Sequence, residues 1–152
     1  MLNNRCRFLV SFGFAFSIGC APEPMTEAEA IAEANCTESN TLCVELMVPE
    51  SYDGQPSRLA TAFYDSSDVN RPPNEVMPEV LSPTIVAGEA YALSHTQMEV
   101  VGEFYLMFVL YDIDGGTWSP EAGLDYTAMT EQPIVFDGTP VNLGELYFEM
   151  GE

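Results

Sequence analysis

An uninterrupted apolar stretch late in the chain places the strongest limit on the fold. Every residue in the segment 104–111 (FYLMFVLY) is apolar or aromatic, so both faces of a strand built from it are hydrophobic. Such a strand is stable in water only where other parts of the protein cover each of its sides. We therefore expect residues 104–111 to form the central strand of a sheet.

The remaining apolar segments are shorter and resemble strands that bury one face. Residues 42–48 alternate, with Leu42, Val44 and Leu46 on one side, and residues 58–66 continue the pattern. A third segment over residues 84–95 is interrupted at Gly88. Four prolines within residues 66–83 predict a long connection with one short edge strand.

The end of the chain carries a turn signal between two further strand patterns. Residues 134–137 and 141–150 flank the sequence Asp-Gly-Thr-Pro, which predicts a terminal hairpin. About six to eight short strands with hardly any helix predict an all-β fold, a single antiparallel β-sandwich. The segments GEFY at 102–105, Tyr111-Asp112 and VNLGEL at 141–146 are similar to those of transthyretin-like or immunoglobulin-like modules of exported bacterial proteins. A shared fold of this kind implies no particular function.

The N-terminal 19 residues have the layout of an export signal. Arg5 and Arg7 precede a mostly apolar segment, residues 8–18, which is too short to span a bilayer. The following Ser-Ile-Gly-Cys20 resembles the lipobox of bacterial lipoproteins, which implies palmitate-type lipidation of Cys20 and anchoring to the bacterial outer membrane or cell surface. Ser17 replaces the usual Leu, Val or Ile, so simple secretion and an uncleaved anchor stay open as alternatives.

Cysteine parity favours lipidation. Removal of residues 1–19 takes Cys6 away and leaves an odd number of cysteines: Cys20, Cys36 and Cys43. If Cys20 carries lipid, Cys36 and Cys43 are free to form a disulfide in an oxidising compartment. The predicted organisation is a signal peptide over residues 1–19, an acidic tether with a short helix over residues 20–35, and a β-sandwich domain over residues 36–152.

The net charge of the chain limits the classes of molecule that it can bind. All 24 acidic residues follow residue 19, where Arg58 and Arg71 are the only basic residues, so the net charge there is 2 − 24 = −22. Such a chain is repelled by nucleic acid and by anionic lipid surfaces. Solubility is the simplest interpretation of this charge, and adaptation to salty surroundings and cation binding are the alternatives. The expected contacts are the membrane, through an N-terminal lipid, and an unidentified envelope protein or extracellular ligand.

One loop contains the candidate metal ligands. Asp112, Asp114, Glu121 and Asp125 supply hard oxygens of the kind that calcium prefers, and the sequence Asp-x-Asp-Gly resembles the start of a calcium loop. The loop is not an EF-hand, because Gly116 occupies the fifth position, where an oxygen ligand belongs. The alternative is a hairpin loop in which Asp and Gly only provide turn geometry. Calcium is the one cofactor that the sequence suggests.

Catalytic chemistry has little support. His95 is the only histidine, which excludes a multi-histidine metal centre, and no G-x-S-x-G motif accompanies it. We expect His95 to be a surface or strand-end residue and assign no catalytic residue. The sequence therefore predicts a non-enzymatic, lipid-anchored binding or structural accessory module. A calcium-binding β-sandwich is the alternative, and a small extracytoplasmic hydrolase is a third hypothesis.

Overall fold

A computed structural model of the chain describes residues 36–112, 120–121 and 123–151. The predicted signal peptide, Cys20, the tether with its helix, and Asp114 lie outside the described residues. The described residues contain no helix and form ten strands. These are β1 (Leu42–Met47), β2 (Arg58–Tyr64), β3 (Glu75–Val76), β4 (Val80–Leu81), β5 (Ala90–His95), β6 (Gly102–Tyr111), β7 (Tyr126–Met129), β8 (Ile134–Phe136), β9 (Val141–Tyr147) and β10 (Glu149–Met150).

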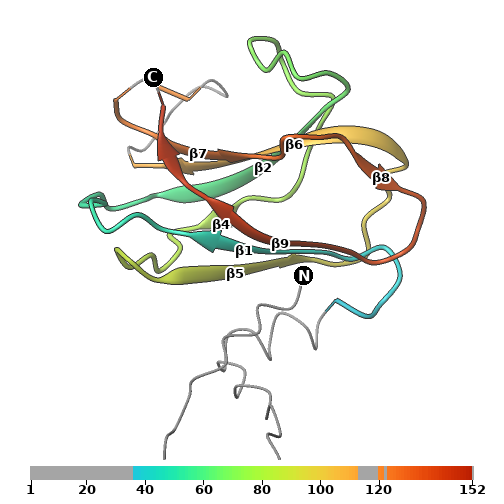
Figure 1. Cartoon of the computed structure of the whole chain (residues 1–152), viewed down its shortest axis with the longest axis horizontal. Coiled ribbons are helices and arrows are strands. Elements are labelled where there is room, and N and C mark those ends of the chain that lie inside the picture. The colour runs from blue at the N-terminus through green and yellow to red at the C-terminus, as the bar shows by residue number, and fades with distance from the viewer. Residues whose placement is uncertain (1–35, 113–119, 122, 152) are drawn as a thin grey trace, which may run out of the picture.

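The strands form two layers (Figure 1). The smaller sheet has the order β5-β1-β9, and the larger one has the order β10-β7-β6-β2-β3, with β4 on β2 and β8 on β6. The predicted all-β sandwich is thus confirmed. Every pair in it is antiparallel except β1 with β9, which run parallel.

The central strand is β6, as its two apolar faces predicted. It pairs with β2 along one edge and with β7 and β8 along the other. Leu106, Phe108 and Leu110 point into the core between the sheets. Met107 and Val109 belong to a second cluster on the outer face of the larger sheet, together with small residues of β2 and the rings of Tyr64 and Tyr111. Both faces of β6 are therefore covered.

The core between the sheets is closed by side chains of β1 and β2. Leu42, Val44 and Leu46 of β1 are fully buried, which fits the predicted alternation in that strand. Phe63 of β2 lies opposite them, and its ring packs edge-on against Phe136, with ring centroids 5.4 Å apart. Each such buried side chain stabilises the fold by about 1.5–3 kcal/mol through removal of apolar surface from water.

The predicted terminal hairpin is wrong, because β8 and β9 belong to different sheets. The turn between them is held by Asp137, whose carboxylate accepts hydrogen bonds from the backbone N–H (3.0 Å) and hydroxyl (2.6 Å) of Thr139. Gly138 in this turn has a φ of 94°, and its carbonyl accepts the N–H of Asn40 at 3.0 Å. The turn therefore passes the chain from one sheet to the other instead of folding it back on itself.

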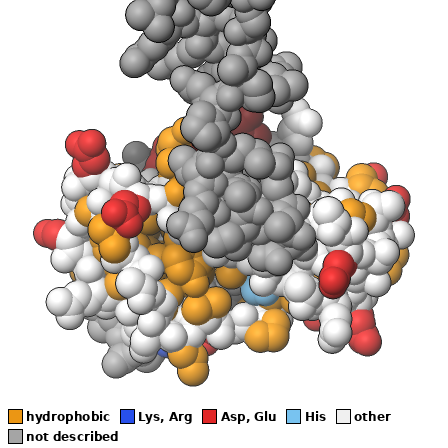
Figure 2. Space-filling model, turned by 90° about the horizontal axis from the view of Figure 1, so that it is seen from below, with side chains coloured by type: hydrophobic (Ala, Val, Ile, Leu, Met, Phe, Trp, Pro, Cys, Tyr) orange, Lys and Arg blue, Asp and Glu red, His pale blue; other side chains and the backbone are white. Residues whose placement is uncertain are grey.

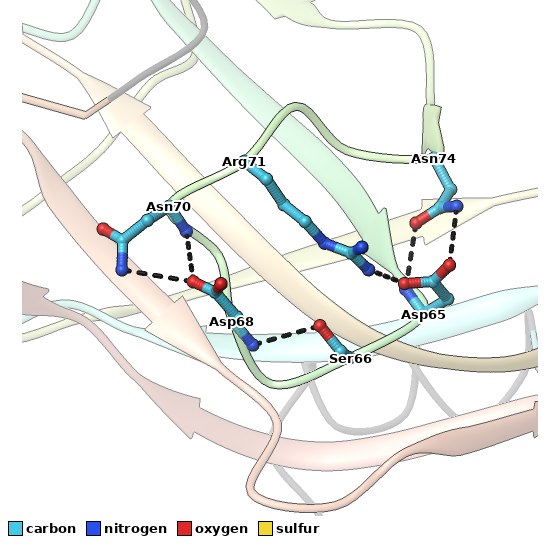
Figure 3. Close-up of polar contacts among 6 residues, drawn as sticks. All are labelled: Asp65, Ser66, Asp68, Asn70, Arg71 and Asn74. Atoms are coloured by element: carbon cyan, nitrogen blue, oxygen red, sulfur yellow. Dashed lines mark hydrogen bonds and ion pairs between the residues drawn. The ribbon is translucent and has the colours of Figure 1, made fainter.

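The proline-rich connection contains the two short strands β3 and β4, both on the edge of β2. The loop that precedes them is held by its own polar side chains (Figure 3). Asp65 forms an ion pair with Arg71 and exchanges hydrogen bonds with Asn74, and Asp68 accepts the N–H of Asn70 at 3.1 Å. These carboxylates are thus engaged in shaping the loop.

Candidate functional site

Asp125 joins the two ends of the candidate calcium loop. Its side chain is 5% exposed, and its carboxylate accepts the backbone N–H of Asp112 at 3.2 Å and that of Glu121 at 2.7 Å. The N–H of Asp125 also donates to the carbonyl of Glu121 at 3.0 Å. Three of the four predicted ligands therefore lie in one hydrogen-bonded group, while Asp114 is outside the described residues. The contacts of Asp125 are those of a residue that closes a loop.

The Asp112 carboxylate lies against a different turn, residues 52–54. Its Oδ1 atom is buried and has no hydrogen-bond partner among the described residues. A Cβ atom added to Gly54 would be 2.1 Å from this oxygen, so the absence of a side chain at Gly54 makes room for the carboxylate. The hydroxyl of Tyr52 is likewise buried without a partner in the described structure. No local pattern in the sequence places residues 52–54 beside Asp112.

Tyrosines surround these carboxylates. The rings of Tyr52 and Tyr126 pack edge-on at 5.0 Å between centroids. Burial raises the pKa of both phenols, and the negative charges of Asp53 and Asp112 raise them further. A phenol is uncharged at physiological pH even at its ordinary pKa of about 10, so this end of the sandwich carries carboxylates set among uncharged aromatic rings.

Tyr111 shows the same effect on the outer face of the larger sheet. Burial, followed by the charge of Asp125, raises the pKa of Tyr111 to about 12. The guanidinium of Arg58 lies 5.1 Å from the centre of the ring and opposes this shift. Arg58 also forms an ion pair with Glu79 at 3.5 Å. Arg58 thus forms an ion pair with Glu79 and also packs on the ring of Tyr111.

The described residues contain no group of three or more His, Cys, Asp or Glu side chains placed to hold a metal ion. Because Asp114 is not among them, the calcium site stays a prediction. In the described geometry, Asp125 has a structural role, and Asp112 supplies the one buried carboxylate oxygen of this loop that lacks a partner.

His95 is the last residue of β5, as the strand-end prediction requires, and its ring reaches across the sandwich. Its Nε2 atom lies 2.9 Å from the hydroxyl oxygen of Thr61 on β2. Thr61 is 1% exposed, and burial lowers the pKa of His95. Since the hydroxyl is closed to substrate, the pair joins the two sheets instead of forming a nucleophile and its base.

Cys36 and Cys43 form the predicted disulfide, with 5.8 Å between their Cα atoms. Cys43 lies in β1 and is 1% exposed, so the bond attaches the chain that enters the domain to the smaller sheet. Two of the three cysteines that follow residue 19 are thereby paired.

In the part of the chain that the structure describes, no helix has the length and apolar character needed to cross a bilayer. A scan against protein-family models, a search of curated proteins and a search of solved structures each find no match to this chain. The resemblances to bacterial lipoproteins and to transthyretin-like or immunoglobulin-like modules therefore stay predictions.

Proposed function

We propose that this chain is a lipid-anchored, non-enzymatic binding or structural module of the bacterial cell envelope. The observation that carries the proposal is the disulfide between Cys36 and Cys43. It leaves Cys20 as the one unpaired cysteine once a signal peptide of residues 1–19 is removed, which supports Cys20 as the site of lipid attachment. The disulfide also fits an oxidising compartment outside the cytoplasm.

The placement of His95 and Asp125 supports a non-enzymatic role. The single histidine of the chain, His95, is bonded to the buried hydroxyl of Thr61. Each carboxylate oxygen of Asp125 accepts one backbone N–H, as expected of a structural residue. The acidic surface is then a solubilising one, held near the membrane by residues 20–35 as an acidic tether.

Lipid labelling in a bacterial host tests the proposal. The full chain is expressed with an alkyne analogue of palmitate, and the label on the purified protein is read on a gel and by intact mass. We expect the wild type and a Cys6→Ala control to carry label and the Cys20→Ala variant to carry none. An unlabelled wild type that begins near residue 20 would show simple secretion, and label retained in Cys20→Ala would also refute the assignment.

Calcium binding is the second candidate function, and the buried, unpartnered Oδ1 of Asp112 favours it. A carboxylate oxygen removed from water without a partner is costly, and a bound cation or an ordered water would offset that cost. The nearby charge of Asp53, seen in its effect on the pKa of Tyr126, adds to the attraction for a cation.

Thermal unfolding with calcium, with magnesium and with chelator at matched ionic strength tests this candidate. Binding only to the folded state adds about 2.7 kcal/mol at a hundredfold excess over Kd, which raises the midpoint by several degrees. We expect a calcium-specific rise in the wild type and in Glu131→Gln, which alters an exposed carboxylate elsewhere, and none in Asp112→Asn. An unchanged wild-type midpoint would leave the loop as a turn.

A further inference from the structure

Among the described residues, the smaller sheet ends in a strand whose outer edge has no partner. β5 pairs with β1 in an unbroken antiparallel register from Ala90↔Met47 to His95↔Leu42. In the order β5-β1-β9 it has no second neighbour, and no backbone hydrogen bond links its outer side to any other described residue. An unpaired strand edge is a template for another extended chain.

The register shows which backbone groups face outward. The N–H of Val48 donates to the carbonyl of Glu89 at 3.0 Å, directly across the β1–β5 ladder. Backbone bonding alternates along an antiparallel pair, so Tyr91, Leu93 and His95 bond to β1. On the far side of β1, the carbonyl of Met47 accepts the N–H of Phe148 at 3.0 Å, as this alternation requires.

The backbone N–H and C=O groups of Ala90, Ala92 and Ser94 therefore point away from β1, along the open edge. Their side chains are small and uncharged, with Ala92 and Ser94 exposed and Ala90 half-buried. Residues 90–95 contain no proline, no lysine and no bulge, the features that usually block pairing at an edge. The other edge of this sheet differs, because β9 continues directly into β10, which pairs with β7 of the larger sheet.

The negative charge around this edge favours a positively charged partner. Glu50, Glu89 and Glu99 near the two ends of β5 are exposed. The basic residues of the described chain, Arg58 and Arg71, both form ion pairs with carboxylates. Figure 2 looks onto the molecule from the side of the smaller sheet and shows acidic side chains around the described surface with almost no basic ones. A second copy of a chain with net charge −20 is repelled, whereas a cationic segment is attracted.

We propose that the outer edge of β5 binds an extended, basic polypeptide segment of another protein by strand addition. Ala90, Ala92 and Ser94 supply the backbone donors and acceptors, and the surrounding carboxylates supply the preference for Lys and Arg. The inference rests on the binding role proposed above and names its class of partner. It does not depend on the lipid, so an absence of palmitate label would leave it standing.

The probe is a synthetic peptide, KVTVKVT, added to the full ¹⁵N-labelled chain in a mild detergent. We expect the N–H groups of Ala90, Ala92 and Ser94 to exchange quickly with solvent in the free protein and more slowly with peptide bound. KPTPKPT, which has the same charge but cannot pair as a strand, and EVTVEVT, which has the opposite charge, are expected to bind at least about tenfold more weakly.

Ala92→Pro removes one outward N–H and leaves the hydrogen bonds to β1 in place. This substitution is therefore expected to weaken the binding of KVTVKVT about tenfold. Ala92→Val keeps the N–H and is expected to bind as the wild type does. The amide-exchange result decides the question if Ala92→Pro fails to fold. Equal binding of KPTPKPT would show charge adsorption alone and overturn the proposal. The proposal would also be overturned if bound peptide left hydrogen exchange at the amides of Ala90, Ala92 and Ser94 unchanged. Protection of these amides by self-association in the absence of peptide would overturn it as well.

Discussion

Replacement of Asp125 by Asn tests whether one buried carboxylate closes the 112–125 loop. The wild-type carboxylate accepts two backbone N–H groups, at 2.7 Å from Glu121 and 3.2 Å from Asp112. In Asn the single amide oxygen can keep one of these bonds, while the NH₂ group faces the other donor. A hydrogen bond to a charged group contributes about 1.5–3 kcal/mol, and the remaining bond loses its charge. We therefore expect the free energy of unfolding to fall by about 2–3 kcal/mol.

Urea unfolding of the full chain, followed by far-UV circular dichroism, measures this loss. With a urea dependence of about 1–3 kcal/mol per molar for a small domain, the midpoint is expected to fall by about 1–2 M. Asp137→Asn is the matched control, because Asp137 also accepts two hydrogen bonds in a turn but is exposed, and a much smaller shift is expected there. Equal midpoints for Asp125→Asn and the wild type would refute the view that this carboxylate stabilises the loop.

Three further predictions concern the ends of the sandwich. Because burial lowers the pKa of His95, its contribution to stability is complete above the unfolded value of about 6.5 and is lost as the pH falls through the lower folded value. The difference in urea midpoint between the wild type and His95→Gln should therefore shrink or reverse from pH 8 to pH 5, and a constant difference would contradict this. Gly54→Ala places a methyl group 2.1 Å from Oδ1 of Asp112, so it should cost about 1–3 kcal/mol in urea unfolding, and clearly less in an Asp112→Ala background. Reduction of the Cys36–Cys43 disulfide should lower stability by about 2 kcal/mol, whereas a Cys36→Ser/Cys43→Ser variant should not respond to reductant.

The candidate site was only partly accessible to sequence reasoning. Asp112, Glu121 and Asp125 do come together, because a strand end and a short loop keep residues close in sequence close in space. The approach of residues 52–54 to Asp112 was missed, since no local pattern shows which turn of one layer meets a loop of the other. The bond between His95 and Thr61 was missed for the same reason, because it joins different sheets.

Local patterns were enough to identify β1, β2 and β6 and the covered position of β6, because alternation and apolar runs report which faces of a strand leave water. They did not indicate β7, and they predicted one short edge strand where the structure has β3 and β4. Of the strand segment predicted over residues 84–95, only β5 forms; it begins at Ala90, two residues after Gly88, which has a φ of 76°. Pairing was decided only by the tertiary structure. β9 lies parallel to β1 instead of folding back on β8, and the two strands are nearly a hundred residues apart in sequence. In this position Val141, Leu143 and Leu146 of β9 are partly buried against the core. Within the described part of the chain, the unpaired outer edge of β5 follows from the same arrangement, since the pairing of a strand edge depends on which neighbours the whole fold brings beside it.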